Sequence, residues 1–223
     1  DIAAVSMHKS GGSLTQSSLL LTNKNVRWEY VAQIINLTQT TSASYLLMSS
    51  LDISRRNLAL RGKESFGKVM KMAEYARNEI NEIGGYYAYG RELNNGSSVF
   101  DYDVTKLSVY TRDIGLAGIE VYDLLRDEYD IQIEFGDIGN ILAYISIGDR
   151  IQDIERLVGA LADIKRLYSK DNAKMLSMEY IPPIVSATPR DAFYADKEML
   201  PIEQTAGRIC SEFVMCYPPG IPI

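Results

Sequence analysis

The decisive stretch of this sequence is residues 2–13, Ile-Ala-Ala-Val-Ser-Met-His-Lys-Ser-Gly-Gly-Ser. Its first half, Ile2–Met7, is mostly apolar and predicts a short buried strand. The polar residues after it end in two adjacent glycines, which indicate a tight turn. Residues 17–21 are again largely apolar and predict a second buried strand. The segment therefore predicts strand, turn and strand, with Lys9 where the first strand ends.

The residues around this strand end have the chemistry of a cofactor site. In α/β sheets, ligands bind at strand ends, and a lysine amine with reduced hydration there becomes a nucleophile toward an aldehyde. Ser6 lies on the same face two residues earlier and can donate to a phosphate oxygen, while His8 adds a second donor or an aromatic ring. These residue types suit pyridoxal phosphate (PLP), which needs a Schiff-base lysine and small phosphate donors. The alternative interpretation is a strand-end lysine in solvent.

Composition limits the class of protein. With 223 residues, 46% hydrophobic and 23% charged, the chain is typical of a globular protein and unlike a disordered or disulfide-rich one. Its net charge is −6 and no basic stripe is present, so nucleic-acid binding is not expected. No apolar run approaches the roughly 20 residues of a membrane span. Two cysteines and one histidine do not fit a four-ligand zinc site, and they suit a reducing cytoplasm.

Helical spacing of apolar residues predicts a helix over Val26–Leu37 and another over residues 44–83. A 40-residue helix is unusually long, so we expect either a break near Arg61-Gly62 or one long helix that connects two subdomains. Ser42 or Ser44 is expected to cap its start.

Strands then alternate with helices, which predicts a small α/β subdomain with a layered sheet. The expected strands are Tyr86–Tyr89, Leu107–Thr111, Ile131–Phe135 and Ile141–Ser146, and the expected helices are Ile119–Tyr129 and Ile151–Tyr168, the second capped by Asp149. All seven prolines lie from Pro182 onward, which indicates a change of architecture near residue 175.

Five motifs along the chain resemble one family in their order and spacing. Residues 6–18, Ser-Met-His-Lys-Ser-Gly-Gly-Ser-Leu-Thr-Gln-Ser-Ser, resemble the PLP-lysine motif of the Orn/Lys/Arg decarboxylases, fold-type-I PLP enzymes that remove the α-carboxylate of basic amino acids. The other four matches are residues 40–47, 188–194, 207–209 and 217–222. The resemblance is strongest to the shorter bacterial arginine decarboxylases of polyamine biosynthesis.

The resemblance implies a role for each matching residue. Lys9 would bind PLP covalently, be displaced by the substrate amine and help to protonate the product carbon. Ser6 and His8 would lie against the cofactor phosphate, and Thr41 and Ser42 would reach the phosphate of a neighbouring subunit across a dimer interface. Glu212 would pair with the distal cation of the substrate; the alternative is a solvated helix glutamate.

The resemblance also implies an α/β architecture in three parts. Residues 1–60 would be the end of a fold-type-I, PLP-binding large domain, 61–170 a small α/β subdomain, and 175–223 the start of a C-terminal α+β decarboxylase domain. In this family the aspartate that pairs with the pyridine nitrogen and the ring that stacks on PLP lie upstream of the lysine. We therefore expect this polypeptide alone to bind PLP poorly and not to decarboxylate.

The function expected from the resemblance is decarboxylation of arginine to agmatine by a cytoplasmic homo-oligomer, at least a dimer. A lysine or ornithine decarboxylase of the same family is an alternative, because nothing here fixes the length of the substrate pocket. A different class of function is an interaction or assembly module without catalysis.

Overall fold

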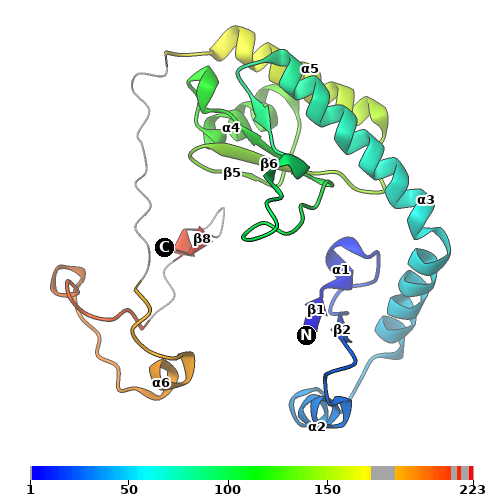
Figure 1. The fold of residues 1–223 in the computed structure, drawn as a ribbon, viewed down its shortest axis with the longest axis vertical. Coiled ribbons are helices and arrows are strands. Elements are labelled where there is room, and N and C mark those ends of the chain that lie inside the picture. Colours follow the sequence, from blue (N-terminus) through cyan, green and yellow to red (C-terminus); the bar gives the residue numbers. More distant parts are fainter. Residues whose placement is uncertain (1, 172–183, 212–214, 217–220, 223) are drawn as a thin grey trace. The chain divides into compact units, whose positions relative to one another are not determined.

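A computed structural model describes residues 2–171, 184–211, 215–216 and 221–222 (Figure 1). The chain divides into two compact units. Unit 1 comprises Asp1–Glu79, Gly90–Leu107 and Tyr144–Arg156, and unit 2 comprises Ile80–Tyr89, Ser108–Ala143 and Leu157–Ile223. The lysine-bearing segment belongs to unit 1.

Unit 1 begins with a two-stranded antiparallel hairpin. Strands β1 (Ile2–Val5) and β2 (Leu19–Thr22) pair so that Val5 lies opposite Leu19. Both expected strands are therefore present, but the burial expected for them is wrong, because Ile2 is 55% exposed and Leu21 52%. Within the described residues these apolar side chains remain uncovered.

The strand expected to run to Met7 ends at Val5, and the tight polar turn expected after it begins as a helical turn. Helix α1 (Met7–Ser10) follows the strand after one residue and buries a single side chain, that of Met7. The Gly11 N–H donates to the Met7 carbonyl at 2.8 Å. A Cβ at Gly11 would lie 2.9 Å from that oxygen and 2.5 Å from Met7 Cε, so the turn requires glycine. Burial of Met7 bends the chain into a helix.

Two helices complete the first part of unit 1. The predicted helix near residues 26–37 is confirmed as α2 (Trp28–Thr38). Helix α3 (Tyr45–Ile83) is continuous over 39 residues, so the break considered at Arg61-Gly62 does not occur. One glycine costs a helix only about 1 kcal/mol, and its neighbours are strong helix formers that include the Glu64–Lys68 pair at 2.9 Å.

The expected α/β subdomain is present as a four-stranded sheet in the order β3-β4-β6-β5. Its strands are β3 (Tyr87–Ala88), β4 (Lys106–Tyr110), β5 (Phe135–Gly136) and β6 (Asn140–Tyr144). Burial alternates along β4 and β6, where Leu107, Val109, Ile141 and Ala143 are buried and their neighbours are half-buried. The sheet therefore has one apolar face, as the period of two in the sequence predicts.

Helices α4 (Gly118–Tyr129) and α5 (Ile151–Tyr168) match the predicted helices closely. Within unit 2, α5 lies beside the end of α3 (Figure 1), where Lys165 Nζ donates to the Ile83 carbonyl at 2.5 Å. The buried Tyr86 hydroxyl donates to the Leu161 carbonyl of α5 at 2.9 Å, and burial raises the pKa of that phenol.

Two local predictions in this subdomain are wrong. The strand expected at Ile131–Phe135 begins only at Phe135, because α4 ends with Asp130 in the left-handed conformation and the Ile131 N–H still bonds to the Leu125 carbonyl at 2.8 Å. Asp149 accepts the Ser146 N–H at 2.6 Å, so its carboxylate closes the preceding turn rather than capping α5.

The proline-bearing region contains one short helix, α6 (Pro189–Tyr194), with Thr188 as its N-cap and proline in its first turn. Two further strands, β7 (Met215–Cys216) and β8 (Ile221–Pro222), pair antiparallel. Every residue from 184 to 199 is exposed in the described chain, including the large apolar side chains of Ile184, Val185 and Met199.

None of the helices in the described part of the chain combines the length and the apolar character that a bilayer crossing requires.

The start of α4 generates a stability prediction. Gly118 opens this helix against the β5–β6 hairpin, and a Cβ there would lie 1.9 Å from the Asn140 carbonyl oxygen. We expect Gly118→Ala to lower the free energy of unfolding by about 1–3 kcal/mol, because the backbone has to move apart. Urea unfolding measures this change.

The matched control is Gly159→Ala in the middle of α5, where a Cβ meets no atom within 4 Å. This substitution is expected to stabilise the protein by about 0.5–1 kcal/mol through helix propensity. Equal effects of the two substitutions would contradict the close approach at Gly118.

Candidate functional site

Three of the expected site residues share one turn of chain. His8 and Lys9 lie on α1, and Ser6 is the residue just before it. The Lys9 N–H donates to the Ser6 carbonyl at 3.2 Å, and the Ser6 side chain makes no capping hydrogen bond to the helix. All three side chains are exposed, so the described residues do not supply the reduced hydration expected around the Lys9 amine. An amine, an imidazole and a hydroxyl are thus grouped at the end of β1.

His8 connects α1 to the residues just before β2. Its Nδ1 atom lies 2.9 Å from the carbonyl oxygen of Ser17, a residue that is only 5% exposed. This hydrogen bond spans the loop that carries both glycines and fixes the imidazole relative to the hairpin.

Helix α3 holds the same loop through two serines that sequence reasoning missed. The Ser54 hydroxyl donates to the Gly11 carbonyl, and the Ser50 hydroxyl accepts the Leu14 N–H at 3.1 Å. The two serines are four residues apart, so they lie on one face of the helix. Ser54 is buried, while its neighbours on the first half of α3 are exposed or half-buried. The signal in the sequence was a pair of hydroxyls at helical spacing, which by itself does not say what they bind.

Thr41 and Ser42 lie in the loop between α2 and α3 and are exposed. The Ser42 N–H donates to Thr40 Oγ1 at 3.1 Å, and Ser44 caps α3 by accepting the Leu47 N–H at 3.5 Å. The expectation that Ser42 or Ser44 caps this helix is therefore met by Ser44. Among the described residues, no hydrogen bond joins Thr41 or Ser42 to α1.

Glu212, the expected partner of the substrate's distal cation, lies outside the described residues. The donor set on α1 nevertheless fits PLP chemically. Lys9 offers a primary amine to the aldehyde, and Ser6 offers a hydroxyl that is not used as a helix cap. These are the groups that a covalently held phosphorylated aldehyde needs.

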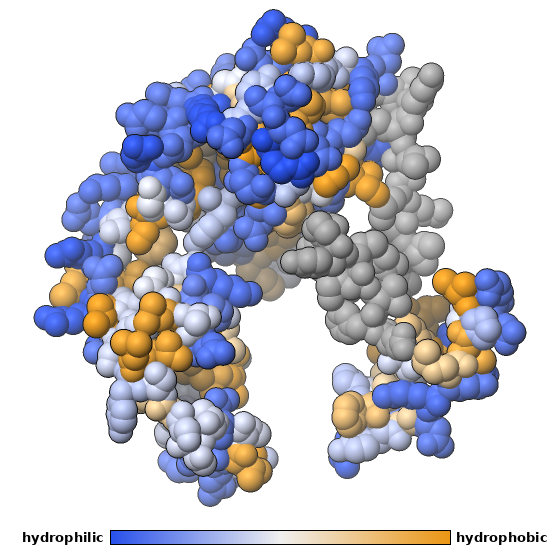
Figure 2. Space-filling view, turned by 180° about the vertical axis from the view of Figure 1, so that it is seen from behind, coloured by the Kyte–Doolittle hydropathy of each residue, from blue (hydrophilic) through white to orange (hydrophobic). Residues whose placement is uncertain are grey.

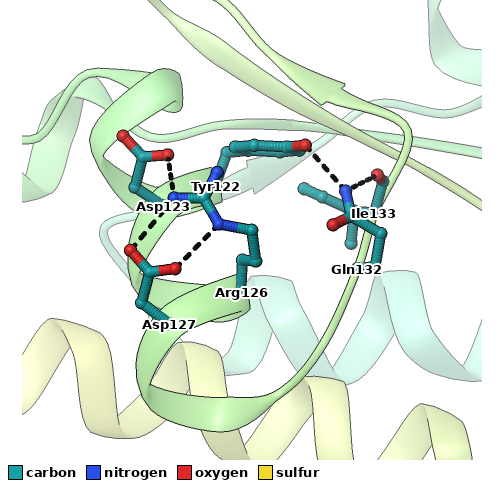
Figure 3. A network of polar contacts seen from close by, with 6 residues as sticks. All are labelled: Tyr122, Asp123, Arg126, Asp127, Gln132 and Ile133. Atoms are coloured by element: carbon teal, nitrogen blue, oxygen red, sulfur yellow. Dashed lines mark hydrogen bonds and ion pairs between the residues drawn. The ribbon is translucent and has the colours of Figure 1, made fainter.

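A second cluster of titratable groups lies on the surface of α4 (Figure 3). Arg126 pairs with Asp123 at 3.0 Å and with Asp127 at 2.7 Å, while Tyr122 accepts a hydrogen bond from Gln132 at 2.7 Å. The hydrogen bond from Arg126 lowers the pKa of the Asp127 carboxyl and raises that of the guanidinium. Because each shift comes from this exposed ion pair, the cluster does not indicate acid–base catalysis.

Among the described residues, no group of three or more histidine, cysteine, aspartate or glutamate side chains is placed to hold a metal ion.

Large apolar side chains are exposed on α2 and the first half of α3. Leu37 is 82% exposed, Tyr45 83% and Leu60 72%. Figure 2 shows such apolar residues in orange among the charged surface of the molecule. Exposed apolar surface is typical of sites that contact other polypeptide, a membrane or a ligand.

The sequence matches a known family model. Residues 2–103 match the model described as "Orn/Lys/Arg decarboxylase, major domain". The whole chain is 42% identical, over 227 aligned residues, to the arginine decarboxylase of Bacillus subtilis, of which it covers 46%. The chain therefore spans about half the length of the curated relatives it matches.

Solved structures show the same fold. The constitutive lysine decarboxylase of Escherichia coli matches 99% of this chain with a TM-score of 0.70, at 18% sequence identity and over 42% of its own length. The lysine decarboxylase of Francisella novicida matches 75% of this chain with a TM-score of 0.62, also at 18% identity and over 28% of its length.

The structural matches show that the chain has the α/β fold of these two lysine decarboxylases. In sequence, residues 2–103 match the model of the Orn/Lys/Arg decarboxylase major domain, and the whole chain is similar to arginine decarboxylases. The resemblance that the order of its five motifs predicts is therefore confirmed.

The serines of α3 generate a prediction about the Lys9 loop. Replacing both in Ser50→Ala/Ser54→Ala removes two hydrogen bonds that hold residues 11–14 to the helix. We expect the Leu14 amide to exchange its hydrogen roughly fivefold faster, since one such bond contributes about 1 kcal/mol. Hydrogen exchange followed by mass spectrometry or NMR measures this rate.

Ser49→Ala, on an exposed position of the same helix, is the control and should leave the Leu14 exchange rate unchanged. Equal exchange rates in the double variant and the control would show that α3 does not hold the loop.

Proposed function

We propose that this chain carries the lysine-bearing part of a PLP-dependent decarboxylase that acts on arginine and releases agmatine. The observation that carries the proposal is the 42% identity to an arginine decarboxylase over the whole chain. The placement of Lys9, His8 and Ser6 on one turn at a strand end supports it, because this is the grouping that the cofactor chemistry needs.

In this proposal the residues of the chain bind and orient the cofactor and the substrate. PLP, when bound, supplies the electron sink for the carbon that loses CO2. Lys9 Nζ would hold the cofactor through its aldehyde, and its amine, once displaced by the substrate amine, would hold a proton for the reacting carbon. Ser6 Oγ and the His8 ring would bind the phosphate and so orient the cofactor.

The proposed enzyme is a homo-oligomer, at least a dimer, in which Thr41 and Ser42 reach the phosphate of the neighbouring subunit. The exposure of Thr41 and Ser42 in the described chain supports a role at a surface shared with a second subunit. The exposed apolar side chains of α2 and α3 support burial of this surface in the complete protein. Glu212 is proposed to bind the distal cation of the substrate.

We also propose the domain division 1–60, 61–170 and 175–223, a cytoplasmic location and a place in polyamine biosynthesis. A lysine or ornithine decarboxylase is the alternative enzyme, since the fold is shared with lysine decarboxylases. A non-catalytic assembly module is the alternative from another class.

Covalent labelling tests the role of Lys9. The full-length protein is mixed with PLP, reduced with borohydride and mapped by peptide mass spectrometry. We expect one pyridoxyl group on Lys9, because this amine alone would be held against the aldehyde. Lys9→Arg should lose the label and reduce decarboxylation to the limit of detection.

The control is Lys24→Arg, which changes the next lysine along the chain, also exposed, and should keep both the label and the activity. A full-length protein that takes up no label at Lys9 would favour the assembly module over the enzyme.

Substrate choice is tested by the release of CO2 from arginine, lysine and ornithine by the full-length protein. We expect arginine to give the highest kcat/KM, since the curated relatives at 41–42% identity are arginine decarboxylases. A higher kcat/KM with lysine or ornithine would show that this amino acid, and not arginine, is the preferred substrate. The proposed role of Lys9 would be unaffected by that result.

A further inference from the structure

Ser17 uses both of its polar groups in the loop that carries Lys9, although it is almost fully buried. Its carbonyl oxygen lies 2.9 Å from Nδ1 of His8. Its hydroxyl donates to the Leu14 carbonyl at 2.6 Å and lies 2.5 Å from the Ser13 hydroxyl. One residue is therefore bonded both to the imidazole and to the loop.

The proton of each hydroxyl in this network has a definite place. The single proton of the Ser17 hydroxyl goes to Leu14, so the Ser13 hydroxyl is the donor in the contact between the two serines. In the same way, the Ser50 hydroxyl donates to the Leu47 carbonyl at 2.8 Å and accepts the Leu14 N–H. Hydrogen bonds thus connect α3 to the backbone N–H of Leu14, and the backbone carbonyl of Leu14 to the side chain of Ser17.

This chain ends on His8 and decides which ring nitrogen carries the proton. A carbonyl oxygen only accepts hydrogen bonds, so the His8 nitrogen that faces Ser17 has to be the donor. The neutral ring then has its proton on Nδ1 and its lone pair on Nε2. Nε2 of the neutral ring therefore has no proton to donate, and only the doubly protonated ring could donate from Nε2 to a phosphate oxygen.

We propose that Ser17 is a positioning residue that holds His8 as the Nδ1–H tautomer and fixes its ring beside Lys9. The hydroxyl of Ser17 anchors the carbonyl that binds the ring, and Ser50 anchors the loop to α3 through Leu14. The part of this inference that concerns cofactor binding rests on the proposed function; the tautomer does not.

The tautomer is measured by long-range ¹H–¹⁵N NMR of this chain without PLP, in which His8 is the single histidine. At a pH where the ring is neutral, we expect the proton on Nδ1. In Ser17→Ala the ring should move toward the tautomer mixture of a solvated imidazole, while Ser17→Thr, which keeps the hydroxyl, should restore the Nδ1–H form. The matched control is Ser18→Ala, on the exposed neighbour, and should resemble the wild type.

A wild-type ring with its proton on Nε2 would overturn the proposal, even if Ser17→Ala failed to fold. A folded Ser17→Ala, checked by circular dichroism, with an unchanged tautomer would also overturn it. Ser50→Ala offers a milder second variant, in which the Nδ1–H fraction should fall between the wild type and Ser17→Ala.

The effect of Ser17 on cofactor binding is measured as the rate at which PLP and borohydride label Lys9 in the full-length protein. We expect this rate to fall about three- to tenfold in Ser17→Ala and to stay unchanged in Ser18→Ala, since one anchoring hydrogen bond is lost. Absence of label in every variant would contradict the proposed function and leave the tautomer result standing. Equal labelling in Ser17→Ala and wild type would overturn the link between the position of the His8 ring and cofactor binding at Lys9.

Discussion

The candidate site depends on how Gly11 is held at both of its polar groups. Its N–H bonds to Met7 within the turn, and its carbonyl accepts the hydroxyl of Ser54, which is 43 residues away in the sequence. A four-residue helix such as α1 is not stable alone, because nucleating a helix costs more than its first hydrogen bond returns. The contact with α3 therefore converts a weak local turn into a fixed platform for His8 and Lys9.

Much of the fold was readable from the sequence, because apolar periodicity reports the face that an element buries. It located α2, α4 and α5 to within two residues at each end. It failed where long-range packing or a cap decides the backbone. The helical turn at α1 follows from the burial of Met7, and the late start of β5 follows from the left-handed cap at Asp130. Neither of these causes changes the periodic pattern of apolar residues in the sequence.

The candidate site could be predicted in part from the sequence, because some of its residues have a recognisable chemistry. Lys9, His8 and Ser6 were found because their residue types match a known chemistry, and their roles still await the labelling experiment. The roles of Ser17 and Ser54 could not be predicted from the sequence, since the sequence does not show which carbonyl oxygen a serine hydroxyl will bind after folding. The pairing of such hydroxyls appears only in three dimensions, where a loop and a helix from distant parts of the chain come together.

The exposed hairpin at the start of the chain has a consequence for folding. β1 and β2 form a two-stranded sheet whose apolar side chains, such as Ile2 and Leu21, are open to solvent. A lone hairpin is marginally stable, and each of its outer edges is a template for another strand. In a crowded cell, an uncovered hairpin of this kind can pair with the same hairpin of a second nascent chain, so aggregation competes with folding at this point.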